Sequence, residues 1–227
     1  MIRISVVHPS FGRHAMAFHR YREWMLHCDH PEYVEYLVGL DDDDPEVVNY
    51  QQMFAKDPTL FGRLEINVGD SRGVIGAVNR VAAVLSPMSA LIIAVSDDLS
   101  PCPHWDTELL DLIAGVDPMQ TIRFIGIQDG RLTDEDFQHL FVTRAWYTRF
   151  GYLLCPEYVH FGADNDANYV AHALDAIIPA SKLMFRHLHY DRGLSAYDAT
   201  YARHRTPEAY SKASDILHAR MARNFDL

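Results

Sequence analysis

Three clusters of aspartates are the residues of this sequence best suited to chemistry. They stand beside expected strands or helices, at Asp41–Asp44, Asp97–Asp98 and Asp164–Asp166. Neighbouring carboxylates at the end of a strand can hold Mg²⁺ or Mn²⁺, because these cations prefer oxygen ligands and share them with phosphate oxygens. A solvated acidic turn or a helix N-cap is the alternative for such clusters.

The carboxylates within the first cluster differ in what they are expected to do. Asp41 and Asp42 are nearest to the end of a strand, so they are expected to face a crevice. Asp43 and Asp44 are expected to lie in a solvated turn before Pro45.

The third cluster leads into an expected helix. Asp166 has the position of an N-cap residue, whose carboxylate would accept hydrogen bonds from the amides of the first turn. Asp164 lies just outside that helix and has less reason to be structural, so it is a candidate general base.

Histidine and arginine side chains add possible partners for these carboxylates. His187 and His189 alternate along an expected strand, which puts both imidazoles on one face, as metal ligands or as half-buried structural residues. Arg13 and Arg72 lie in turns after two strands and are expected at the edge of the crevice, unless they are solvent-exposed loop residues.

Strand and helix patterns alternate along the chain, which is typical of an α/β fold. Apolar and β-branched runs predict strands at 2–7, 33–40, 66–68, 90–95, 121–128, 140–143 and 182–190. Helical spacing of apolar residues predicts helices at 14–27, 74–85, 105–113, 169–177 and from 207 onward, the last with Thr206 as N-cap. The run 90–95 is apolar throughout, so it is expected to be a central strand covered on both faces. We expect the strand ends to bring the acidic clusters to one crevice.

Composition and missing motifs exclude several classes of protein. The 227 residues are 48% hydrophobic and carry a formal net charge of −11, which indicates one globular domain and argues against binding to nucleic acid through overall charge. A Gly-x-Gly-x-x-Gly fingerprint and a P-loop are both absent, which argues against a dinucleotide-dependent dehydrogenase and a P-loop enzyme. Three widely spaced cysteines and no apolar run of about 20 residues predict a soluble cytoplasmic protein with reduced thiols.

The order of these segments resembles the inverting family 2 of the GT-A nucleotide-sugar glycosyltransferases. Residues 4–13 are similar to the family's first strand and turn, 36–42 to its second strand, and 67–69 to its Asn-x-Gly stretch. Residues 94–98 lie where the Asp-x-Asp motif is expected, and 141–152 resemble the acceptor-side strand and helix. Residues 162–166 are similar to the Gly-Glu-Asp-x-Asp motif, and 187–195 to the C-terminal histidine segment. The resemblance spans about residues 2–200. It implies a single-domain α/β fold of the GT-A type over 1–227, with a mostly parallel central sheet flanked by helices.

The resemblance also implies an organisation and a function. Residues 1–100 would bind the nucleotide, 101–205 the acceptor and metal, and 206–227 would form a C-terminal helix. The activity would be metal-dependent, inverting transfer of a sugar from a nucleoside-diphosphate sugar, with a UDP-sugar favoured. Asp164 would be the catalytic base, Asp98 with His187 and His189 would bind Mn²⁺ or Mg²⁺, and the nucleotide sugar would contact Pro9, Ser10, Arg13, Asp41, Asp42, Arg72 and Asp97.

Two departures from the family pattern keep other functions open. Ser96 stands where the first Asp of Asp-x-Asp is expected, and Ala163 stands where the Glu before the catalytic Asp is expected. A non-catalytic module that binds a sugar nucleotide or glycan is one alternative. A sugar-1-phosphate nucleotidyltransferase is another, although the segment 8–13 has only Gly12 for a phosphate loop.

The acceptor is open among a glycan, a small molecule and a modified nucleic acid. The last of these would use a basic stretch near the C-terminus, which is otherwise a solvated helix face: Arg203, His204, Arg205, Lys212, Arg220 and Arg223. No feature of the sequence predicts the oligomeric state.

Overall fold

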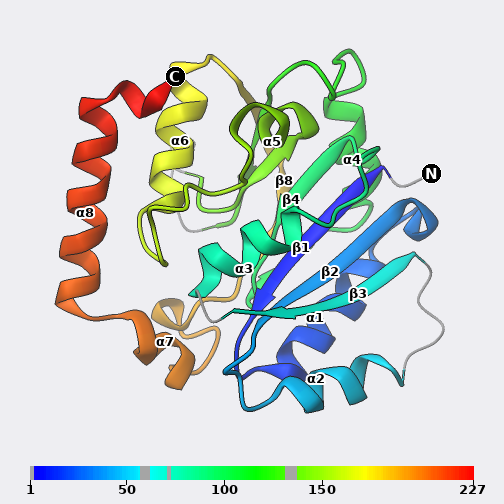
Figure 1. The fold of residues 1–227 in the computed structure, drawn as a ribbon. Helices are drawn as coiled ribbons and strands as arrows, with labels where there is room; N and C mark the ends of the chain where they lie inside the picture. Colours follow the sequence, from blue (N-terminus) through cyan, green and yellow to red (C-terminus); the bar gives the residue numbers. More distant parts are fainter. Residues whose placement is uncertain (1–2, 57–61, 71–72, 131–136) are drawn as a thin grey trace.

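The computed structural model describes residues 3–56, 62–70, 73–130 and 137–227. Seven strands form one sheet in the order β3-β2-β1-β4-β7-β6-β8 (Figure 1). Neighbouring strands are parallel except β7, which is antiparallel to β4 and β6. The strand bounds are β1 Ile4–Ser10, β2 Val34–Asp41, β3 Arg63–Gly69, β4 Leu91–Ala94, β6 Phe124–Gln128, β7 Phe141–Thr143 and β8 Ile177–Met184. A mostly parallel α/β sheet was predicted, and it is confirmed.

Helices cover both faces of this sheet. One core packs α1 (His14–Leu26), α2 (Val47–Phe54) and α4 (Trp105–Leu112) against it. A second core packs α3 (Gly73–Ala82), α5 (Arg144–Phe150) and α6 (Ala163–Ala173). The remaining helices are α7 (Ala199–His204), α8 (Pro207–Ala222) and the short 3₁₀ turns η1 (Pro31–Tyr33), η2 (Tyr190–Arg192) and η3 (Asn224–Asp226).

The strand β4 has the central position that its apolar sequence predicts. It lies between β1 and β7, and its residues Leu91, Ile92 and Ile93 have no exposed surface. Strand β1 runs three residues further than predicted, through His8 and Pro9 to Ser10. Pairing of β1 with β4 ends at Val7, so Pro9 has no strand neighbour on that side. Although proline has no backbone N–H, this position therefore loses no hydrogen bond between strands.

Two predicted elements have different bounds in the structure. Helix α6 begins at Ala163, six residues before the predicted start, so Asp164 lies in its first turn and not outside the helix. The predicted strand 182–190 is divided into the end of β8 and a short β9 (Arg186–His187), which pairs with β5 (Leu99–Ser100). Helices α2 and α7 were not predicted, whereas α5 lies within the segment 141–152, where the resemblance implied a strand and a helix.

The C-terminal part of the chain returns to the carboxyl ends of β1 and β4. Antiparallel pairing of β5 with β9 sets Leu99 opposite His187, and the Leu188 amide donates to the Asp98 carbonyl at 2.7 Å. Beyond this point α7 lies near the end of β1, and α8 runs alongside α6 (Figure 1).

Two further predictions concern the thiols and the membrane. Cys28, Cys102 and Cys155 are free cysteines. None of the helices in the described ranges combines the length and the apolar character that crossing a membrane requires.

Candidate metal and nucleotide-sugar site

A cavity of about 650 Å³ opens at the carboxyl ends of the central strands. Segments from α3, α6, α7 and α8 complete its wall. The predicted site residues that line it are Pro9, Ser10, Arg13, Asp41, Asp97, Asp98, Asp164, His187 and His189. Asp42 is exposed and does not line the cavity, and Arg72 lies outside the described residues.

The three predicted metal-binding residues meet in this cavity. Ligand atoms of Asp98, His187 and His189 lie within 4.8 Å of one another, and all three side chains are buried. The two imidazoles do lie together, with ring centroids 5.1 Å apart, although only His187 belongs to β9 and His189 precedes the turn η2. One carboxylate with two imidazoles suits Mn²⁺ better than Mg²⁺, because Mg²⁺ favours an all-oxygen shell. The residues present fit a divalent ion.

Hydroxyl groups and an imidazole surround Asp98. Its Oδ1 accepts a 2.6 Å hydrogen bond from Ser96, and its Oδ2 accepts one of 2.6 Å from Tyr201 and lies 3.4 Å from His187 Nε2. Burial by itself would raise the pKa of Asp98, but the hydrogen bonds and the positive charge of His187 hold it well below its usual range. The carboxylate is therefore ionised and ready to bind a cation.

His187 lies between two carboxylates. Its Nδ1 is 3.3 Å from Asp129 Oδ2, on the side away from Asp98. Burial lowers the pKa of His187, but hydrogen bonds to Asp129 and Asp98 outweigh it and raise the pKa to about 9. Asp129 was not predicted, although it directly follows an expected strand, which is the position that singled out Asp98.

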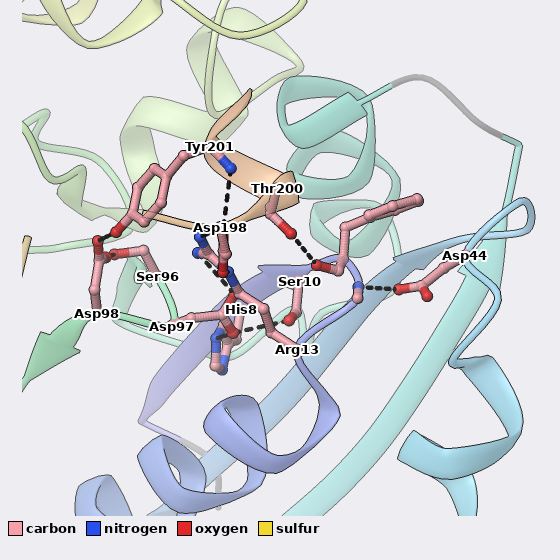
Figure 2. A network of polar contacts seen from close by, with 12 residues as sticks. His8, Ser10, Arg13, Asp44, Ser96, Asp97, Asp98, Asp198, Thr200 and Tyr201 are labelled. Carbon is pink, nitrogen blue, oxygen red and sulfur yellow. Dashed lines mark hydrogen bonds and ion pairs between the residues drawn. The ribbon is translucent and has the colours of Figure 1, made fainter. Parts of the chain in front are cut away.

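A network of polar contacts ties the ends of β1 and β4 together (Figure 2). Asp97 Oδ1 accepts hydrogen bonds from His8 Nε2 at 3.0 Å and from the Ser10 hydroxyl at 2.8 Å. Arg13 lies 3.7 Å from Asp97 Oδ2 and forms a bidentate ion pair with Asp198 at 2.8 and 2.7 Å. The network fixes a guanidinium at the cavity wall.

The segment 198–205 closes over this network and was not predicted as part of the site. The Thr200 hydroxyl donates to the Phe11 carbonyl at 3.0 Å, and the Tyr201 ring stacks with Arg13 at 4.3 Å (Figure 2). Arg205 donates to His189 Nε2 at 3.2 Å. Segments far apart in the sequence form these contacts, so no local pattern could have found them.

The first acidic cluster corrects one expectation. Asp44, predicted to be solvated, is 4% exposed and accepts hydrogen bonds from the amides of Gly12 and Glu46 at 2.7 and 2.8 Å. It shapes the turn after β1. Asp41 lines the cavity as predicted, and its Oδ2 accepts a 3.0 Å hydrogen bond from the Gly73 amide. Its buried Oδ1 has no hydrogen-bond partner within the described chain.

The third acidic cluster, Asp164–Asp166, corrects a second expectation. Asp166 is not an N-cap: it is buried and forms a bidentate ion pair with Arg220 of α8 at 2.9 and 3.2 Å. Asp164 is half-buried and lines the cavity from the first turn of α6. Ala163 is 1% exposed, packs in an apolar cluster with Ile75 and Tyr158, and also lines the cavity.

The basic stretch near the C-terminus does not form one solvated face. Arg203 and Arg205 line the cavity, Arg220 is buried in its ion pair, and Arg223 pairs with Glu157 at 2.6 Å. Arg220 therefore departs from the expected solvated face, whereas Arg203, Lys212 and Arg223 are exposed.

The order of the strands and the helices on both faces of the sheet are those of the GT-A fold. Structural neighbours show the same fold. A mannosyltransferase from Pyrobaculum calidifontis, in complex with GDP-Man and Mn²⁺, aligns over 97% of this chain and 75% of its own, with a TM-score of 0.63 and 14% identity.

Two further neighbours carry uridine nucleotides. TarS 1-349 from S. aureus with UDP-GlcNAc aligns over 95% of this chain and 65% of its own (TM-score 0.66, 13% identity). Glucosyl-3-phosphoglycerate synthase from Mycobacterium tuberculosis, in complex with Mn²⁺, UDP and glucosyl-3-phosphoglycerate, aligns over 94% of this chain and 79% of its own (TM-score 0.58, 13% identity). No protein-family model and no curated protein sequence matches the chain.

Proposed function

We propose that this chain is a metal-dependent, inverting glycosyltransferase that takes a sugar from a nucleoside-diphosphate sugar. The observation that carries the proposal is the buried Asp98, His187 and His189 cluster in the same cavity as Asp41 and Asp164. Transfer of a sugar would need the metal ligands, the group that binds the nucleoside and the general base around one donor molecule.

The nucleoside would bind beside Asp41. The buried Oδ1 accepts no hydrogen bond from the described residues, and the nearest cation, Arg80 Nη1, lies 3.8 Å away, so a ring N–H can donate to it; a buried acceptor left without a hydrogen bond costs about 1–3 kcal/mol. Uracil N3–H and guanine N1–H are such donors. The neighbours that bind UDP-GlcNAc, UDP and GDP-Man support this class of base.

The diphosphate would lie between the metal ligands and the arginines of the cavity wall. Arg13, Arg203 and Arg205 line the cavity, and guanidinium forks match phosphate oxygens. A divalent cation held by Asp98, His187 and His189 would offset the charge that develops on the departing nucleoside diphosphate. Tyr201 and Arg205, which contact Asp98 and His189 in this structure, would exchange these partners for the bound ligands.

The proposed general base is Asp164. An acidic side chain is favourable in the first turn of a helix, and this one faces the cavity. It would accept the proton of an acceptor hydroxyl as that oxygen attacks the anomeric carbon opposite the leaving group. One displacement inverts the configuration.

Binding and turnover test the proposal together. Purified protein would be titrated calorimetrically with UDP, GDP, UDP-GlcNAc and GDP-Man, each with and without Mn²⁺, and slow hydrolysis of a bound donor would be followed by nucleotide release. We expect Mn²⁺-dependent binding and release of a nucleoside diphosphate with an inverted free sugar.

The alternatives give different results in the same experiment. Release of pyrophosphate from a nucleoside triphosphate and a sugar 1-phosphate would identify a nucleotidyltransferase. Tight donor binding without hydrolysis or transfer would identify a binding module. No binding of any nucleotide would contradict the whole proposal.

A further inference from the structure

Resting on the proposed function, we infer that Asp129 positions His187, so that His187 binds the metal through Nε2 and keeps a proton on Nδ1. Asp129 does not line the cavity and would touch neither donor nor acceptor. It would act only through the imidazole that it contacts.

The geometry puts the two ring nitrogens of His187 on different partners. Nδ1 lies 3.3 Å from Asp129 Oδ2, and Nε2 lies 3.4 Å from Asp98 Oδ2 inside the metal-ligand cluster. A carboxylate accepts hydrogen bonds and cannot donate them when ionised, so the nitrogen that faces Asp129 must carry the proton. Nε2 faces the Asp98 carboxylate in the same way, so both nitrogens carry a proton when no metal is bound; a cation held by Asp98 would replace the proton on Nε2, whereas Nδ1 would keep its own.

The backbone around Asp129 holds this arrangement. The register between β6 and β8 shifts between Ile127 and Gln128, directly before Asp129, and such irregularities redirect the side chains that follow. The His187 amide also donates to the Asp129 carbonyl at 3.1 Å. Both the ring and the main chain of His187 are therefore fixed to the same residue.

The burial of Asp129 is a further reason to expect that its carboxylate is paired with His187. Asp129 is 6% exposed and His187 7% exposed. A buried carboxylate is costly unless it is paired. His139 packs its ring against His187 at a centroid distance of 5.0 Å, and its Nε2 is 3.8 Å from Asp129 Oδ2. The ligand atoms of Asp129, His139 and His187 also lie within 4.8 Å of one another, so a metal bound there through Nδ1 is the competing arrangement.

Mn²⁺ affinity tests the inference without relying on activity. The affinity would be measured by electron paramagnetic resonance for the wild type, Asp129→Asn, His187→Ala and the double variant. Loss of such an outer carboxylate weakens metal binding about 10- to 100-fold. We expect that loss in Asp129→Asn, and less than about a twofold further change when His187 is already Ala. Equal effects of Asp129→Asn in both backgrounds would overturn the inference.

A matched control separates positioning from general destabilisation. Asp106 is also buried, and its carboxylate accepts 2.8 Å hydrogen bonds from the amides of Asp29 and His30, outside the cavity. Asp106→Asn should therefore lower the melting temperature without changing Mn²⁺ affinity. A wild type that binds no Mn²⁺ would contradict the proposed function itself, whereas a normal wild type with an unaffected Asp129→Asn contradicts only this inference.

A measurement on the wild type covers the case in which Asp129→Asn does not fold. In Zn²⁺-loaded protein labelled with ¹⁵N-histidine, the imidazole resonances report which nitrogen carries the proton. We expect His187 to show a protonated Nδ1 and a metal-bound Nε2. A metal-bound Nδ1 would overturn the inference and assign the ion to the Asp129, His139 and His187 group.

Discussion

The Tyr201 hydroxyl donates a hydrogen bond of 2.6 Å to Asp98 Oδ2, across 103 positions of the sequence. The same oxygen faces His187 Nε2 in the metal-ligand cluster. Helix α7 is therefore attached to a residue that we propose as a metal ligand. Burial, followed by the negative charge of Asp98, raises the pKa of Tyr201 to about 12, so the phenol is a donor at neutral pH.

Removing this donor should favour the metal. In Tyr201→Phe, Asp98 Oδ2 no longer has a hydroxyl partner that a cation would have to displace. We expect Mn²⁺ affinity to rise by up to about tenfold and the metal-free protein to lose about 1–2 kcal/mol of stability. Calorimetry and urea unfolding measure the two effects. Weaker Mn²⁺ binding in Tyr201→Phe would show that the hydroxyl supports the metal site.

Removing the proposed base should spare binding. Asp164→Asn keeps the size of the side chain but cannot accept a proton, so we expect kcat to fall about 10²- to 10⁴-fold. UDP and Mn²⁺ affinity should stay within about twofold, because Asp164 is outside the metal-ligand cluster. Near-normal turnover in steady-state assays would exclude the role of general base.

Asp41 should select the base of the nucleotide. Asp41→Asn removes the charge from the buried acceptor, so we expect UDP to bind about 10- to 100-fold more weakly in calorimetric titrations. The control is Asp111→Asn, an exposed carboxylate on α4, which should bind UDP like the wild type. Equal UDP affinity in Asp41→Asn and the control would place the base elsewhere.

Metal binding should depend on pH through His187. Its pKa of about 9 in the metal-free protein means that a proton must leave before Nε2 can bind a cation. Between pH 6 and 8 we expect Mn²⁺ affinity to rise about tenfold per pH unit, with about one proton released per ion. Titrations in buffers of different ionisation enthalpy count that proton. A flat profile would contradict the prediction.

His187 should also affect the stability of the metal-free protein, and this effect has the opposite dependence on pH. Since the pKa of His187 is raised from 6.5 to about 9 by folding, its contribution is complete below pH 6.5 and is lost as pH rises toward 9. Urea unfolding of metal-free wild type against His187→Gln should show this difference shrinking over that range.

The ion pair of Asp166 with Arg220 should be a structural requirement. Both side chains are 2% exposed, and the pair joins α6 to α8. Arg220→Met would leave a buried carboxylate without its cation, so we expect a loss of about 3–5 kcal/mol in urea unfolding. In the exposed control Arg223→Met the loss should be below about 1 kcal/mol. Similar losses in the two variants would show that burial adds little to this pair.

Local patterns predicted most of the sheet. The apolar run at β4 and the end of a strand at Asp41 were predicted correctly, because burial on both faces and the position at a strand end leave a direct signature in the sequence. The early start of α6 was missed because its first turn is rich in Asp and Asn, which favour turns as readily as a helix N-terminus.

The candidate site also has a part that the sequence predicts and a part that it does not. The sequence by itself supplied the candidates for binding a cation or removing a proton, Asp98, Asp164, His187 and His189, and all four line one cavity. Only the tertiary structure decided which groups surround them. It placed Tyr201 on Asp98, Asp129 on His187, and Arg220 on Asp166, through contacts 54 to 103 residues apart. Such partners are brought together by the packing of whole elements, for which no short stretch of sequence carries a signal.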